Sequence, residues 1–264
     1  MGSAGMMPIS ESHPRGRAAA QKALEIDETL GEAHAALASI ITDYYWNWAE
    51  AERRFRRAIE LNPSYATARH WFSLYLGHMG RFDEALAEAK RARELDPLSP
   101  VIDANMGVVY FRAGRYDEAI AHLQRVIALD SRFGFAHMCL GLAYLQNGMV
   151  EQAIRTFQTA KTLSSVPNLD ALIGYGHARA GRGREAEAIL AKLQDDTTTR
   201  FASAYDVALV YTALGDRDGA FSWLNRAVDR REWFVVMLKV DSLLDPLRSD
   251  PRYGRLLQRV GLAP

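Results

Sequence analysis

The strongest constraint in this sequence is a set of residues that recurs every 34 positions through the middle of the chain. Three series keep this step: Gly80, Gly114 and Gly148; Ala85, Ala119 and Ala153; and Leu61, Leu95, Leu129 and Leu163. A fixed period of this length is typical of stacked supersecondary units, each of which can bury its apolar face only against a neighbour. The period therefore predicts an elongated stack of repeats.

Within one period the apolar residues have helical spacing. From Ala66 to Met79, apolar and small residues recur every three or four positions, as on a helix with one buried face. Gly80 follows, and glycine tolerates the left-handed backbone that ends a helix. A second helix then begins with Asp83 near its positive end, and Pro97 marks the start of the next segment. Each period therefore predicts two helices joined by a tight turn.

Two neighbouring periods carry nearly the same motif at the start of the second helix. Residues 81–85 read Arg-Phe-Asp-Glu-Ala and residues 115–119 read Arg-Tyr-Asp-Glu-Ala, with the small Gly107 and the aromatic Tyr110 at matching positions before the second motif. This spacing resembles the tetratricopeptide repeat. The resemblance implies an all-α fold, a right-handed superhelical solenoid of antiparallel helix pairs, and it specifies this architecture more firmly than any attached activity.

The resemblance divides the chain into three parts. Residues 15–232 are expected to form about six units plus a partial first unit, residues 233–264 to form C-terminal capping helices, and residues 1–14 to be disordered or a remnant of cloning. In the last part Asp250 can cap a helix and Pro251 can occupy its first turn. The partial first unit leaves one side of residues 15–26 without a partner, so self-association through this unit is one hypothesis.

The second unit departs from the pattern in two ways. The distance from Glu28, at the proline position, to Pro63 is 35 residues, so this unit holds one extra residue, and Trp46 replaces the usual glycine. Trp46 and Trp48 can pack as a staple or form an exposed partner contact, and we favour packing because indoles bury a large area. This turn and the C-terminal tail resemble repeat regions of bacterial multidomain regulators. A sensory or assembly portion of such a signalling enzyme or transcription regulator is therefore the alternative function.

Composition argues against several classes of partner. Lysine plus arginine and aspartate plus glutamate both number 32, so the chain lacks the basic excess typical of nucleic-acid binders. The run Arg53–Arg57, which holds four arginines, is interpreted as a solvated helix face paired with Glu52 and Glu60. No apolar stretch approaches the roughly 18 residues that a membrane span requires. One cysteine, Cys139, suits a reducing compartment, and we predict a cytoplasmic location.

The sequence offers no set of residues with the spacing of a reactive centre. The histidines are scattered over different units, which predicts no metal site. Gly174-Tyr175-Gly176 lacks a preceding strand and is interpreted as close helix packing rather than a nucleotide loop. Cys139 lies in an apolar helix without a neighbouring base and is interpreted as a small buried or groove residue. We therefore predict no catalytic residues, no cofactor and no enzyme activity.

In tetratricopeptide proteins the first helices of successive units line a concave face, and the resemblance places the binding surface there. The predicted groove consists of His70, Leu74, His78, Val108, Phe111, Arg112, Phe135, Met138, Leu142, Leu145, Tyr175, Arg179 and Tyr205. This set lacks the Lys and Asn of the family's carboxylate clamp and is mostly apolar. It therefore predicts a protein-interaction scaffold that holds an amphipathic helix or an extended apolar peptide. Burial of Phe111, Leu142 and Leu145 by tighter closure of the superhelix is the competing interpretation.

Overall fold

The computed structural model describes residues 9–164, 168–195 and 203–262. Helices are the only regular elements in these ranges. The first six α-helices and one π-helix are α1 (Ile9–Ile26), α2 (Gly31–Ile40), η1 (Ile41–Tyr45), α3 (Trp48–Leu61), α4 (Ala66–His78), α5 (Phe82–Leu95) and α6 (Pro100–Arg112). The remaining helices are α7 (Tyr116–Leu129), α8 (Gly134–Gln146), α9 (Val150–Leu163), α10 (Leu169–Arg179), α11 (Gly183–Gln194), α12 (Ala204–Leu214), α13 (Arg217–Asp229), η2 (Trp233–Met237), η3 (Ser242–Leu247) and α14 (Pro251–Arg259), of which η2 and η3 are 3₁₀ helices.

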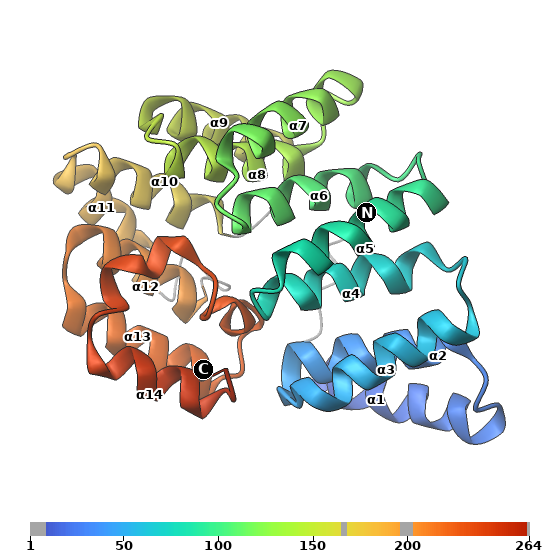
Figure 1. The fold of residues 1–264 in the computed structure, drawn as a ribbon. Coiled ribbons are helices and arrows are strands. Elements are labelled where there is room, and N and C mark those ends of the chain that lie inside the picture. Colours follow the sequence, from blue (N-terminus) through green and yellow to red (C-terminus); the bar gives the residue numbers. More distant parts are fainter. Residues whose placement is uncertain (1–8, 165–167, 196–202, 263–264) are drawn as a thin grey trace, which may run out of the picture.

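Successive helices form antiparallel pairs that stack into a curved array (Figure 1). The pairs run from α2 with α3 to α12 with α13, and the first helices of neighbouring pairs also touch, as α4 touches α6 and α6 touches α8. The predicted all-α repeat solenoid is confirmed. None of the helices described is long and apolar enough to cross a membrane.

The predicted turns between paired helices lie where the glycines recur. Gly80, Gly114 and Gly148 have positive φ angles of 79°, 73° and 80°. At such positive φ angles a side chain would collide with its own backbone. Glycine has no side chain, so it ends each first helix at little cost. In the irregular unit Trp46 takes the same place with a φ of 56°, and the extra residue is accommodated by the π-helix η1 just before it.

The N-terminal helix begins earlier than the sequence predicted. Helix α1 starts at Ile9, not Arg15, so residues 9–14 of the segment expected to be disordered are helical, while residues 1–8 lie outside the described residues. Glu11 lies in the first turn, where it favours the positive end of the helix, and the ring of His13 packs 5.8 Å from that of Tyr44. Ala20 of α1 is buried against the next pair, and Ile26 is left 79% exposed.

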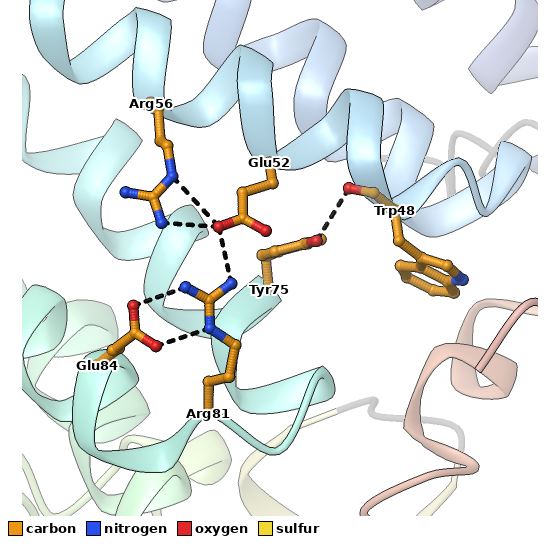
Figure 2. A network of polar contacts seen from close by, with 6 residues as sticks. All are labelled: Trp48, Glu52, Arg56, Tyr75, Arg81 and Glu84. Carbon is orange, nitrogen blue, oxygen red and sulfur yellow. Dashed lines mark hydrogen bonds and ion pairs between the residues drawn. The ribbon is translucent and has the colours of Figure 1, made fainter. Parts of the chain in front are cut away.

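Polar contacts tie neighbouring units together (Figure 2). Glu52 of α3 accepts hydrogen bonds from Arg56 in its own helix and from Arg81 in the next unit, both at 2.7 Å. Arg81 also donates to Glu84 at 2.6 Å, and the Tyr75 hydroxyl donates to the Trp48 carbonyl at 2.9 Å. The arginines around Arg56 therefore lie on an ion-paired outer face, as the sequence predicted.

Small residues let the two helices of a pair approach closely. A Cβ atom at Gly107 would lie 2.6 Å from Leu123, and one at Gly141 would lie 2.5 Å from Phe157, which is fully buried. A Cβ at Gly176 would similarly lie 2.7 Å from Ile154 on the neighbouring helix, which confirms that this glycine serves packing. Interiors are packed as densely as organic crystals, so these contacts leave no room for a methyl group.

We expect Gly141→Ala to destabilise the protein, because the new methyl group must displace the buried Phe157 ring. Overpacking of this kind costs about 1–3 kcal/mol, which urea unfolding followed by circular dichroism would measure. The matched control is Gly183→Ala in the first turn of α11, where a Cβ would meet nothing within 4 Å. Equal stability of the two variants would contradict the packing explanation.

Candidate functional site

A semi-enclosed cavity of about 250 Å³ lies between the first helices and the C-terminal segment of the chain. Helices α4, α6, α8, α10 and α12 supply one part of its wall, and residues 233–243 supply the rest. In Figure 1 this C-terminal segment turns back from α13 to lie beside α4, and Val240 sits 3.8 Å from the Cβ position of Gly80. The concave face therefore has a cover made by the chain itself.

Two tyrosines of the repeats and one glutamate hold this cover in place. The hydroxyl of Tyr175 donates to the Leu243 carbonyl at 3.0 Å, and that of Tyr205 donates to the Asp241 carboxylate at 2.7 Å. The Glu232 carboxylate accepts from two backbone N–H groups at the start of α12, at 2.9 and 3.0 Å. Because such groups at a helix start have no partner inside the helix, Glu232 fixes the entry of the C-terminal segment.

Most residues predicted for the groove are brought together at this cavity. Nine of the thirteen line it: Leu74, His78, Val108, Phe111, Arg112, Phe135, Met138, Leu142 and Tyr205. The other four do not. His70 and Leu145 are buried away from the cavity, Tyr175 is buried beneath the C-terminal segment, and Arg179 is exposed.

Sequence reasoning missed the far wall of the cavity. Trp233, Phe234, Met237 and Leu243 face the first helices, although this segment was expected to cap the end of the stack. Helix α14 does pack against α13, and it starts as predicted, with Asp250 accepting a hydrogen bond from the Arg252 backbone N–H. The aromatic composition of residues 233–237 was the available signal, because an exposed cap has little use for such side chains.

Buried polar atoms without a hydrogen-bond partner gather in the cavity wall. Within the described residues they include both ring nitrogens of His78, Nη1 of Arg112, Oδ1 of Asn168 and Oδ1 of Asp206. Buried polar groups are normally paired, and each one left unpaired costs about 1–3 kcal/mol. These atoms therefore remain available for hydrogen bonds within a mostly apolar wall.

Burial shifts the titration of these groups. It lowers the pKa of His78 well below its usual value, with the Arg112 charge adding to the effect, so the imidazole is neutral at pH 7. It lowers the pKa of Arg112 to about 10, which leaves the guanidinium charged. It raises the pKa of Asp206 to about 7 and that of the Cys139 thiol to about 12. The cavity therefore holds a cation, a neutral imidazole and a partly protonated carboxyl group.

The irregular turn of the second unit meets the C-terminal part of the chain. Arg231 donates to the Tyr44 carbonyl at 2.6 Å, and its guanidinium lies over the rings of Tyr44 and Trp46, 5.3 and 4.7 Å from their centres. The Trp48 indole donates to the Val260 carbonyl at 2.8 Å. The two tryptophans of the irregular turn thus pack against residues 231 and 260 of the C-terminal part of the chain. We call this set of contacts the latch.

The comparisons with known proteins agree with the repeat fold. A family model for the TPR repeat matches residues 107–148, and a second, for the tetratricopeptide repeat, matches residues 47–100. The chain is a tetratricopeptide repeat (TPR) protein. Members of this family are generally non-catalytic, and the TPR protein is accordingly a scaffold for protein–protein interaction.

Solved structures share the fold of the TPR protein at low sequence identity. A human IFIT1 dimer with m7Gppp-AAAA is 16% identical with a TM-score of 0.66, over 94% of this chain and 68% of that one. PilW, a widely conserved type IV pilus biogenesis factor, is 22% identical with a TM-score of 0.60, over 71% and 87%. A thermophilic TPR protein of Thermus thermophilus is 21% identical with a TM-score of 0.52, over 68% and 98%. A search of curated protein sequences finds no match.

We expect Arg231→Ala to loosen the cover, because it removes a charged hydrogen bond and two cation–π contacts of the latch. Contacts of these kinds are worth roughly 2 kcal/mol together, so hydrogen exchange in residues 233–262 should accelerate by at least tenfold. Arg226→Ala is the control, since Arg226 lies over Trp223 within its own helix. Unchanged exchange in Arg231→Ala would show that the latch does not hold the segment.

We expect Asp206→Asn to change how stability depends on pH. The folded-state pKa of Asp206, about 7, lies above its ordinary value of 3.8, so the folded protein keeps a proton between pH 4 and 7 that the unfolded chain has lost. Stability therefore falls as pH rises through this window, by up to about 1.4 kcal/mol per pH unit, and the variant should lack this contribution. Urea unfolding at pH 5, 6, 7 and 8 would measure the difference from the wild type.

Asp250, a carboxyl group whose pKa is lowered rather than raised, serves as the control for this measurement. The Arg252 side chain and backbone hold the pKa of Asp250 at about 2, so its contribution is present above pH 4 and is lost below it. Asp250→Asn should therefore leave the slope between pH 5 and 8 unchanged. If Asp206→Asn also leaves that slope unchanged, Asp206 is ionised in the folded protein.

Proposed function

We propose that this TPR protein binds a short apolar segment of a partner protein in the cavity between its first helices and the C-terminal cover. The observation that supports this proposal is the group of buried polar atoms that lack hydrogen-bond partners among the apolar side chains of the cavity wall. As parts of the same proposal, the protein is a non-catalytic cytoplasmic scaffold without a cofactor, and its partner is a protein rather than a nucleic acid, since the net charge of the chain is zero.

The walls suit apolar side chains. Phe111, Phe135 and Leu142 are partly exposed toward the cavity, and Met138 adds a flexible, polarisable side chain that adapts to different shapes. An apolar cavity of about 150 Å³ holds one benzene ring, so one of about 250 Å³ accepts one or two large side chains. A whole helix does not fit, and the size favours an extended segment that inserts its side chains.

The unpaired polar atoms suit the main chain of such a segment. Each peptide unit offers one N–H donor and one carbonyl acceptor. Asn168 Oδ1 can accept from a peptide N–H, and Arg112 Nη1 and the ring N–H of His78 can donate to an oxygen atom of the segment. Binding would therefore satisfy groups that the free protein leaves unpaired, which adds to the affinity gained from apolar burial.

We expect Leu142→Glu to weaken peptide binding, because it places a carboxylate in the apolar wall. A displayed library of random 12-residue peptides, panned against the wild type, should select sequences rich in large apolar residues. Affinity for the selected peptides should fall at least tenfold in Leu142→Glu and in Phe111→Glu, as measured by fluorescence anisotropy.

The matched control is Leu129→Glu, since Leu129 is 85% exposed at the end of α7 and lies outside the cavity. Circular dichroism establishes that each variant is folded. Retained binding in folded Leu142→Glu, or an equal loss in Leu129→Glu, would contradict the proposed site.

A further inference from the structure

The guanidinium of Arg112 occupies an unusual place for a cation. It lies in the last turn of α6, where Nη1 is 3.4 Å from the Cβ position of Gly77 on α4. Nη2 has only the sulfur of Met237 as an acceptor, at 3.7 Å, and Nη1 is buried without any acceptor within the described residues. The guanidinium therefore lies against α4 at the cavity wall.

Nothing within the described residues forms an ion pair with Arg112. The carboxyl group that acts on it most strongly is Asp241, but both oxygens of Asp241 are already hydrogen-bonded, to the Tyr205 hydroxyl at 2.7 Å and to the Leu243 backbone N–H at 2.9 Å. Thirteen of the other arginines form ion pairs with Asp or Glu in the described part of the chain. A buried cation is normally paired, because its loss of hydration is otherwise uncompensated.

His78 adds a second donor at the same place. It is 3% exposed, it ends α4, and neither ring nitrogen has a partner within the described residues. Because the neutral imidazole carries one N–H, it can donate one hydrogen bond without adding charge. The Arg112 guanidinium and the His78 imidazole therefore line the same cavity, and each has a nitrogen without a partner within the described residues.

We propose that the partner segment carries an aspartate or glutamate beside its large apolar residue, and that this carboxylate pairs with Arg112 and His78. This inference rests on the proposed function, since it names the chemistry of the segment bound in the same cavity. An arginine–carboxylate pair shielded from water is charge-assisted and strong, so it would select acidic segments over neutral ones.

Two carboxyl groups of the protein face the same cavity and bear on this selection. Asp241 is held by its two hydrogen bonds, and burial raises the pKa of Asp206 to about 7, so that Asp206 is partly protonated at neutral pH. Neither group makes an ion pair with Arg112 within the described residues, so the guanidinium stays available to a carboxylate from outside.

The test uses capped peptides whose only carboxylate is a side chain. The best peptide from the library is synthesised with an acetylated N-terminus and an amidated C-terminus, and each position next to its largest apolar residue is set to Glu or Gln. We expect the wild type to bind one Glu peptide at least tenfold more tightly than its Gln counterpart. Arg112→Gln should lose this preference while still binding the Gln peptide, and Arg112→Lys should restore part of it.

The control variant is Arg179→Gln, because Arg179 also lies in the last turn of a first helix but is exposed and outside the cavity. It should keep the preference. Equal binding of the Glu and Gln peptides by the wild type would overturn this inference and leave the proposed function standing. A preference that appears only with a free C-terminal carboxylate would also overturn it, whereas failure to select any peptide would overturn the proposed function itself.

Discussion

The structure depends on the close contact between the two helices of each pair and on the apolar face that each pair leaves for the next. Gly107 and Gly141 allow this contact, since a single methyl group at either would collide with the facing helix. A stack built in this way always has a curved inner wall formed by first helices. Here the wall is partly covered by the chain's own C-terminal segment, so the binding surface is reduced from an open groove to a cavity of about 250 Å³.

Much of the fold was predictable because it is periodic. The position of a residue within the 34-residue unit determines the helix face on which it lies, and for this reason Leu74, Val108 and Leu142 could be assigned to the inner wall from sequence alone. The left-handed turns at Gly80, Gly114 and Gly148 followed from the same register. Both inferences needed only local geometry and contact between neighbours.

The repeat gave no information on where the cover lies, because the contacts of the cover are not periodic. Arg231 and Tyr44 are 187 positions apart, and Trp48 and Val260 are 212 apart, so no spacing in the sequence connects them. The unpaired atoms of His78 and Arg112 were equally hidden, because pairing depends on which side chains arrive from distant segments. The position of each residue within the 34-residue unit nevertheless placed both at the inner wall. That their nitrogens lack partners is seen only once the cover is in place.

The latch has a mechanical consequence. An open solenoid extends under tension like a spring, since each unit touches only its neighbours and the strain is shared along the array. In this protein Arg231, Tyr44 and the two tryptophans of the irregular turn join the second unit of the array to its C-terminal part. Tension applied between the two ends would therefore meet a stiff response until these contacts rupture, and only then would the helices unwind gradually.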